Sequence, residues 1–137
     1  MEKTVKKKKS HPKERRKHTR MPLLFEAELQ LPSKAVYRGK TKDISFSGIY
    51  IYLSNVKACS PGDQCRLVLF LDPQISQKAI SFNCQIVRTD EAGIGIKFID
   101  TDIRGYQEFK KIMTYNSPDP DKLTAELEKD PGLEILK

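Results

Sequence analysis

The fold of this chain is indicated most clearly by residues 43–53, which read Asp43-Ile-Ser-Phe-Ser-Gly48-Ile-Tyr-Ile-Tyr-Leu53. The first half of this stretch gathers aspartate, serine and glycine, which favour Asx and Ser/Thr turns. Its second half alternates Ile49, Ile51 and Leu53 with two tyrosines, and all five are strand-forming residues. The stretch therefore predicts a tight turn that leads directly into a β-strand.

Five further short segments have the residue pattern of β-strands. In residues 23–31 apolar side chains recur at every second position, which predicts a half-buried strand. The other predicted strands cover residues 36–42, 65–71, 80–87 and 93–98. Turn formers separate the strands and no helical segment lies between them. The pattern predicts a mainly β fold, an antiparallel barrel or sandwich rather than a parallel sheet.

The hydrophobic pattern changes to a period of about 3.6 residues after residue 102. We expect a C-terminal α-helix that packs on the barrel through one stripe: Ile103, Tyr106, Phe109, Ile112 and Met113. Prolines 118 and 120 end it. Residues 116–137 form a C-terminal extension, in which we predict a second short helix from Asp121, a candidate N-cap, to Glu128.

Composition describes one small domain with an unburied tail. The 137 residues are 38% hydrophobic and 31% charged. Residues 1–20 carry ten lysines and arginines against two glutamates, which is more than the whole net charge of +7. Residues 1–14 have too few apolar side chains to offset the entropy of ordering, so we expect a disordered basic tail. Since the body is near neutral, a nucleic-acid-binding domain with its charge on the folded part is not indicated.

Several other classes of protein are not indicated either. No apolar run approaches the roughly 20 residues of a transmembrane helix, and the N-terminus lacks the apolar core of a signal peptide, so we expect a cytoplasmic protein. The three cysteines are odd in number and lack CxxC spacing, so they predict neither a disulfide framework nor a metal site. Both histidines, His11 and His18, lie in the basic stretch. A nucleophile–histidine pair would have to recruit a disordered segment, so an enzyme is not predicted.

Two short motifs remain. Arg16-Lys-His-Thr-Arg20 has the form RxxxR, where the arm meets the first strand, and Asp43-Ile-Ser-Phe-Ser-Gly48 has the form DxSxxG, where the second strand turns into the third. In this order and strand context the sequence resembles the PilZ family of cyclic di-GMP receptors, from about residue 15 to about residue 115. The strand at residues 93–98 and the helix after it also fit. The resemblance implies a six-stranded antiparallel barrel, a C-terminal helix, and a receptor in place of an enzyme, with no cofactor besides the ligand.

The resemblance implies that the arginines of the arm hold the ligand. Arg16 and Arg20 would bind guanine and phosphate, because a planar guanidinium can pair with guanine O6 and N7 or with a phosphate. Arg15 would add a third cation, and an arginine at that place in the family tends to accompany an intercalated ligand dimer. The ligand stoichiometry stays open at this point.

The DxSxxG motif supplies the rest of the implied site. Asp43 would accept hydrogen bonds from guanine donors, Ser45 would bond through its hydroxyl, and Gly48 would let the backbone approach the ligand. Further residues that could reach the ligand from neighbouring strands are Gly95, Lys97 and Arg88.

A mobile arm suggests how binding could signal. Ordering the six residues 15–20 costs roughly 6–12 kcal/mol, while a micromolar ligand supplies about 8 kcal/mol net. Either the gross ligand contacts are much larger, or part of the arm is ordered beforehand. We expect ligand binding to order the arm and to signal to an unidentified downstream protein.

Other readings of the sequence stay open. The domain could be a ligand-free PilZ-like module that binds proteins. The lysine-rich tail could bind nucleic acid without specificity, could attach to an anionic membrane surface, or could only raise solubility. No aromatic residue interleaves with Lys6–Lys9, so specific nucleic-acid binding is not expected.

Overall fold

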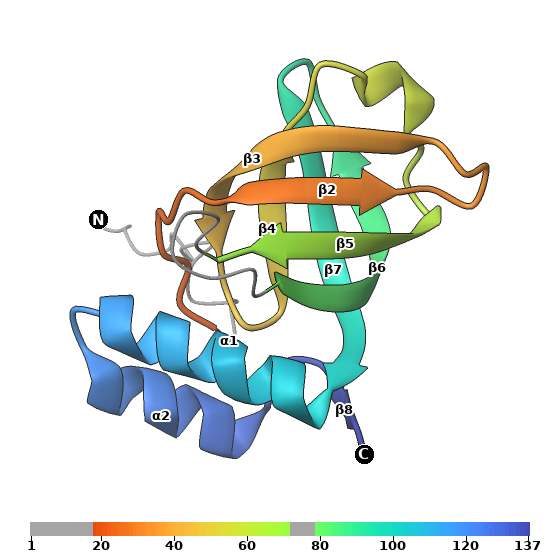
Figure 1. Cartoon of the computed structure of the whole chain (residues 1–137). Helices are drawn as coiled ribbons and strands as arrows, with labels where there is room; N and C mark the ends of the chain where they lie inside the picture. Colours follow the sequence, from red (N-terminus) through yellow and green to blue (C-terminus); the bar gives the residue numbers. More distant parts are fainter. Residues whose placement is uncertain (1–17, 72–78) are drawn as a thin grey trace, which may run out of the picture.

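A computed structural model describes residues 18–71 and 79–137 of the chain. It shows a β-barrel above two helices (Figure 1). The predicted disordered tail, residues 1–14, lies outside the described residues. The barrel strands are β2 (Glu26–Gln30), β3 (Val36–Ile44), β4 (Gly48–Tyr52), β5 (Gln64–Phe70), β6 (Ala79–Thr89) and β7 (Gly93–Asp102).

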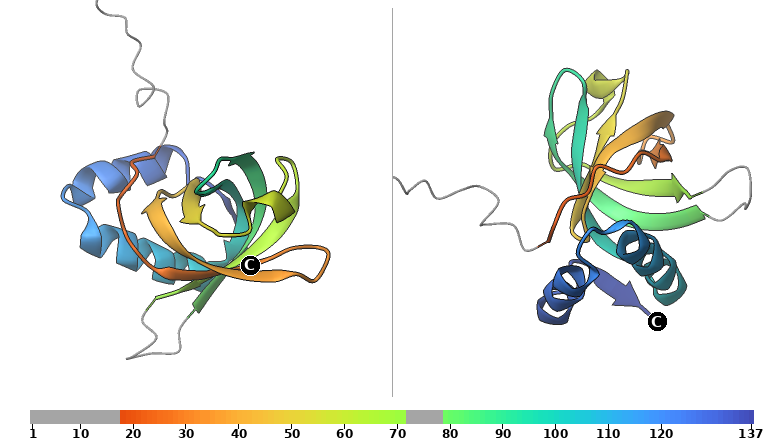
Figure 2. Two further views of the ribbon diagram at one scale, coloured as in Figure 1. Left: turned by 90° about the horizontal axis from the view of Figure 1, so that it is seen from above. Right: turned by 90° about the vertical axis from the view of Figure 1, so that its left-hand side faces the viewer.

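The six strands form a closed antiparallel barrel, as the sequence and its resemblance predicted. Neighbouring strands follow the order β4-β3-β2-β5-β6-β7, and pairing of β4 with β7 closes the ring (Figure 2). Closure leaves none of these six strands as an open edge. A 3-10 turn, η3 (Val56–Ala58), lies between β4 and β5.

Alternate residues of each strand fill the interior of the barrel. The clearest case is β6, where Ile80, Phe82, Cys84 and Ile86 are all buried, as the period-two pattern predicted. Cys59, Cys65 and Cys84 are free thiols and belong to the same core. Burial is the main reason that the pKa of Cys84 is raised, so this thiol stays protonated and acts as a small apolar group.

The first helix, α1 (Ile103–Asn116), begins directly after β7 and packs on one end of the barrel. The Asp102 side chain caps it by accepting a hydrogen bond from the Gly105 N–H at 2.6 Å. Phe109 is buried against Phe82 and Phe98, with ring centroids 5.3 and 5.7 Å away. Ile103 is 43% exposed, so its predicted place on the packed stripe is wrong. It stands at the first helical position, while the buried residues lie in later turns of the helix.

The C-terminal extension contains a second helix, α2 (Pro120–Lys129), where one was predicted. Its N-cap is Asp119 and not Asp121, because Pro120 takes the first helical position and the Asp119 carboxylate accepts from the Lys122 N–H. Leu123 is its buried residue. A short strand, β8 (Glu134–Leu136), then pairs parallel with β7, and the sequence analysis did not foresee it.

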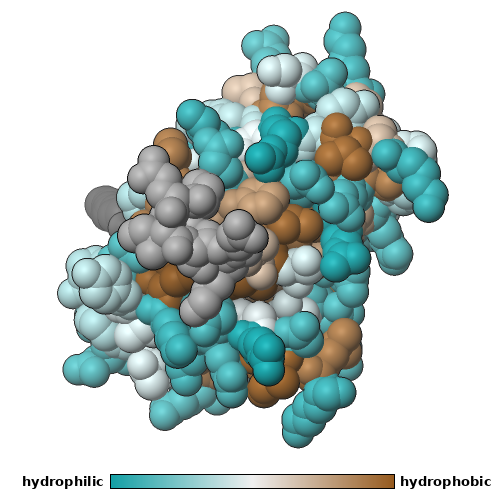
Figure 3. Space-filling model, viewed as in Figure 1, coloured by the Kyte–Doolittle hydropathy of each residue, from teal (hydrophilic) through white to brown (hydrophobic). Residues whose placement is uncertain are grey.

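The two helices lie side by side on the same side of the barrel in all views of the chain (Figures 1 and 2). On the face shown in Figure 3, polar side chains cover the periphery and apolar ones gather toward the middle. Among the described residues, no helix is both long enough and apolar enough to span a membrane.

Candidate functional site

A pocket of about 570 Å³ lies beside the turn between β3 and β4. Its volume falls in the range of roughly 300–1,000 Å³ that is typical of small-molecule sites. Every predicted site residue within the described part of the chain lines it: Arg20, Asp43, Ser45, Gly48, Arg88, Gly95 and Lys97. Arg15 and Arg16 lie outside the described residues. The fold thus brings together residues that are up to 77 positions apart, from Arg20 to Lys97.

Asp43 reaches the pocket from the end of β3. The pairing of β3 with β4 shifts register between Thr41 and Asp43, and Asp43 then stands opposite Tyr50. Such a bulge re-aims the side chain that follows it. Asp43 is half-buried, and its carboxylate has no hydrogen-bond partner among the residues that the structure describes. It is therefore an acceptor available to a ligand.

Ser45 and Gly48 shape the turn itself. The Ser45 hydroxyl oxygen accepts hydrogen bonds from the N–H groups of Ser47 and Gly48, each at 3.2 Å. Gly48 lies so close to β7 that a Cβ there would stand 2.4 Å from the carbonyl oxygen of Ile96. Only glycine fits this position without displacing the barrel backbone. In this structure the hydroxyl of Ser45 therefore holds the turn.

Phe46, at the centre of the DxSxxG motif, anchors the turn to the core. It is fully buried, and its ring centroid lies 5.1 Å from that of Phe109 on α1. The ring of His18 lies on another side of Phe46, at 6.4 Å. No role was predicted for Phe46, since it stands at a variable position of the motif. Its burial now explains why the turn is rigid.

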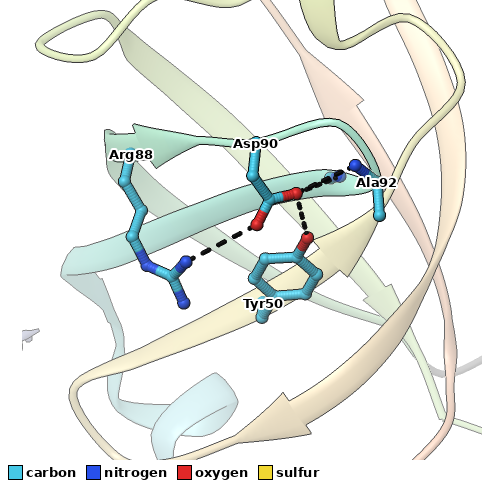
Figure 4. A network of polar contacts seen from close by, with 5 residues as sticks. Tyr50, Arg88, Asp90 and Ala92 are labelled. Carbon is cyan, nitrogen blue, oxygen red and sulfur yellow. Dashed lines mark hydrogen bonds and ion pairs between the residues drawn. The ribbon is translucent and has the colours of Figure 1, made fainter.

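A second wall of the pocket is a polar network on β4, β6 and the following turn (Figure 4). The Tyr50 hydroxyl donates to Asp90 Oδ1 at 2.6 Å, and the Ala92 N–H donates to the same oxygen at 2.9 Å. The Arg88 guanidinium lies 3.7 Å from Asp90 Oδ2 and 5.2 Å from the centre of the Tyr50 ring. The network fixes Arg88 on the pocket wall.

The same contacts perturb the two acids of the network in opposite directions. Burial, reinforced by the hydrogen bond to Asp90, raises the pKa of Tyr50 to about 12. The hydrogen bond from Tyr50, followed by that from the Ala92 N–H, lowers the pKa of Asp90. Near neutral pH the wall therefore carries a neutral phenol, a carboxylate and a guanidinium. Tyr50 and Asp90 were not predicted as site residues, because neither belongs to a recognisable motif.

The third wall is the segment that carries Arg20, which runs from the helices toward the barrel (Figure 2). Met21 bridges to Ile44 of β3 through two backbone hydrogen bonds of 2.8 and 2.9 Å. His18 is 2% exposed, and its Nε2 donates to the carbonyl oxygen of Asp130 at 2.6 Å. Thr19 contacts Glu126 on α2.

These contacts hold His18 and Thr19 against the C-terminal extension, which fits the alternative that part of the arm is ordered before the ligand binds. The partners of these two residues are separated from them by 112 and 107 positions, so no local pattern could reveal them. His18 itself is buried, which its place in a basic stretch did not indicate.

The charges around the pocket suit an anion that also carries hydrogen-bond donors. Arg20, Arg88 and Lys97 supply positive charge, and Asp43 and Asp130 supply carboxylates. Arginine can pair with planar or phosphate acceptors through two parallel N–H groups. Within residues 18–71 and 79–137, no group of three His, Cys, Asp or Glu side chains is placed to hold a metal ion.

Comparison with known proteins shows where similar folds occur. The family model of the PilZ domain matches residues 14–114. The PilZ domain of CeSA, from a cellulose-synthesizing bacterium, is 19% identical with a TM-score of 0.55, over 69% of this chain and 92% of that one. The PilZ domain of Escherichia coli YcgR, solved with c-di-GMP, is 15% identical with a TM-score of 0.59, over 84% and 96%.

A third similar structure is the Bacillus subtilis inhibitor of motility, MotI/DgrA, at 15% identity and a TM-score of 0.58. The match covers 85% of this chain and 52% of that protein, so the chain spans about half of its length. At these identities the structures show a shared fold. The sequence matches no curated protein.

Proposed function

Because this chain belongs to the PilZ domain family, we propose that it is a receptor for cyclic di-GMP that binds the messenger in the pocket beside the β3–β4 turn and signals to a partner protein. The proposal is that of a binding protein and not of an enzyme. The similar PilZ domain of YcgR was solved with this ligand.

One observation carries the proposal. The fold gathers Arg20, from the RxxxR motif, and Asp43, from the DxSxxG motif, on the walls of a single pocket. The antiparallel bridge between Met21 and Ile44 brings the two segments together, with Arg20 next to Met21 and Asp43 next to Ile44. Two motifs that are separate in the sequence thus line one pocket, which supports a single recognition site.

The chemistry of the ligand fits these groups. Cyclic di-GMP presents two phosphates, and each guanine presents O6 and N7 acceptors on one edge and N1 and N2 donors on the other. We assign guanine or phosphate to Arg20, and the guanine N1 and N2 donors to the free carboxylate of Asp43. Arg88 and Lys97 would neutralise phosphate from the opposite wall. Gly95 has no side chain and so leaves room on that wall beside Arg88. Ser45 and Gly48 would present the turn to the ligand.

We extend the proposal to Arg15 and Arg16, which precede the described residues, and infer that ligand binding orders this part of the arm. His18 and Thr19 are already held by the C-terminal extension, so the entropy of fixing them does not oppose binding. Only the residues before His18 would have to be ordered by the ligand. A partner protein could then recognise the liganded arm.

Isothermal titration of cyclic di-GMP into the full chain at about 0.15 M salt tests the proposal. We expect saturable binding, with a stoichiometry that separates one ligand from an intercalated pair. Arg20→Ala should raise Kd by about 10- to 100-fold, because a bidentate contact contributes roughly 1–3 kcal/mol. Asp43→Asn should raise Kd by a similar factor, since the amide has only one oxygen that can accept a hydrogen bond.

Arg104→Ala is the matched control, since Arg104 is an exposed arginine on α1 that does not line the pocket. Its Kd should stay within twofold of that of the wild-type protein, and GTP should bind far more weakly than cyclic di-GMP. No binding of cyclic di-GMP by the folded wild-type chain would reject the receptor function and leave the barrel as a protein-interaction module.

A further inference from the structure

Thr19, which stands between His18 and Arg20, is held by a carboxylate from the far end of the chain. Glu126 of α2 accepts the Thr19 N–H on Oε1 at 2.8 Å and the Thr19 hydroxyl on Oε2 at 2.6 Å. Both carboxylate oxygens of Glu126 thus accept hydrogen bonds from Thr19. Hydrogen bonds to a charged acceptor are about twice as strong as those between neutral groups.

A second contact holds the neighbouring residue to the same extension. His18 donates from Nε2 to the carbonyl oxygen of Asp130, just after α2, and its ring is buried. Gly132 then passes so close that a Cβ there would stand 2.4 Å from the Phe46 carbonyl oxygen and 3.1 Å from His18 Cε1. The C-terminal extension therefore touches both the arm segment and the DxSxxG turn.

Arg20 lies between two anchors of different kinds. On its C-terminal side Met21 is fixed to β3 by backbone pairing. On its N-terminal side Thr19 is fixed to α2 by the side chain of Glu126. Arg20 itself is exposed and lines the pocket. Its backbone direction depends on both anchors, and only the anchor on β3 belongs to the barrel.

We propose that Glu126 is a positioning residue of the ligand site: by holding Thr19 it sets Arg20 at the pocket, so that docking of α2 and binding of the ligand favour each other. The inference rests on the proposed receptor function. Without Glu126 the segment before Met21 keeps only the contacts of His18, and the ligand must fix Thr19 and Arg20 again. Binding then weakens although every residue that touches the ligand is still present.

Thermodynamic linkage gives the inference a second consequence. If docked α2 raises the affinity for the ligand, bound ligand must stabilise docked α2 by the same factor. Ligand binding would therefore stabilise docked α2, although none of its residues 120–129 lines the pocket. The exposure of the C-terminal extension would then depend on whether the pocket holds a ligand.

Titration of cyclic di-GMP into full-length variants tests the first consequence. We expect Glu126→Ala to raise Kd about tenfold, which corresponds to about 1.4 kcal/mol. Glu126→Gln keeps one acceptor oxygen and should lose less. Glu128→Ala is the matched control, because Glu128 is exposed on the same helix, and its Kd should equal that of the wild type.

A double-mutant cycle separates positioning from a general loss of stability. Thr19→Val removes the hydroxyl contact and should raise Kd about threefold. Combined with Glu126→Ala it should add almost nothing, because both changes remove the same interaction. Thermal melts of all variants, recorded beside the titrations, show that each is folded; if Glu126→Ala does not fold, Glu126→Gln and Thr19→Val carry the test.

Hydrogen exchange tests the reciprocal effect. Saturating cyclic di-GMP should slow exchange of the α2 amides in the wild-type chain, and should not slow it in Glu126→Ala. Wild-type binding with unchanged Kd for folded Glu126→Ala, or unchanged α2 exchange on saturation, overturns the inference while the receptor function stands. Absence of binding by the wild type rejects the receptor function itself, and the inference with it.

Discussion

The two walls of the pocket that carry the motifs are held in different ways. The turn with Asp43, Ser45 and Gly48 is fixed by strand pairing on both sides and by a fully buried phenylalanine. The segment with Arg20 has one backbone bridge to the barrel, and its other contacts go to the C-terminal extension.

The difference shows which part of the site can be adjusted. A wall made by barrel pairing can change only if the barrel changes, because closure distributes any strain over all six strands. A wall held by a histidine and a carboxylate can be released by undocking one helix. In this chain the barrel thus holds the DxSxxG motif, while the C-terminal extension holds the residues next to Arg20. Three substitutions test this difference between the two walls.

Gly48→Ala should have the largest effect. The added Cβ would meet the Ile96 carbonyl oxygen at 2.4 Å, and neither strand can move without opening the barrel. We expect a loss of about 3 kcal/mol in the free energy of unfolding, measured by urea denaturation. Gly62→Ala is the control: it has φ +97° but open space around it, so it should cost only about 1 kcal/mol. Equal losses for the two variants would contradict a rigid wall.

Gly132→Ala should have a smaller and more local effect. Its φ is +90°, and its Cβ would stand 2.4 Å from the Phe46 carbonyl oxygen, but the C-terminal segment can shift away from the barrel. We expect a loss of about 2 kcal/mol in the free energy of unfolding. Hydrogen exchange should increase in α2 and at Thr19, and stay unchanged in β3 and β4. Faster exchange throughout the barrel would show that the two walls are not separable.

Tyr50→Phe should have the smallest effect and a distinct pH dependence. Losing the hydrogen bond to the Asp90 carboxylate should lower the free energy of unfolding by about 1–2 kcal/mol at neutral pH. The pKa of Tyr50 is raised from 10 to about 12, so the folded state keeps this proton longer than the unfolded state does. The stability advantage of the wild type is complete below pH 10 and shrinks as the pH rises toward 12. Denaturation of both proteins from pH 7 to 12 would measure this, and a constant difference would exclude the raised pKa.

Much of the fold was visible in the sequence because its signals are local. Short alternating or continuous apolar segments between turn formers located β2 to β7, and the change of period after Asp102 located α1. β8 was missed because three residues are too few to show a period, and it forms only where β7 offers a partner. Ile103 was misplaced because periodicity gives the face of a helix but not the turn at which packing starts.

The candidate site divides in the same way. Asp43, Ser45 and Gly48 could be predicted because the turn that they form lies within six residues. Tyr50 and Asp90 could not, since their contact joins positions 40 apart and needs β4 and β7 to pair.

By itself, the sequence determined the barrel strands, the helix after them and the two motifs, since these depend on the order of apolar, polar and turn-forming residues along short segments. Only the tertiary structure decided that the two motifs share one pocket and that His18 is buried. It also decided that Glu126 holds Thr19. The contacts of His18 and Thr19 join residues more than 100 positions apart, and they exist only after the closed barrel and the two helices have fixed where each segment lies.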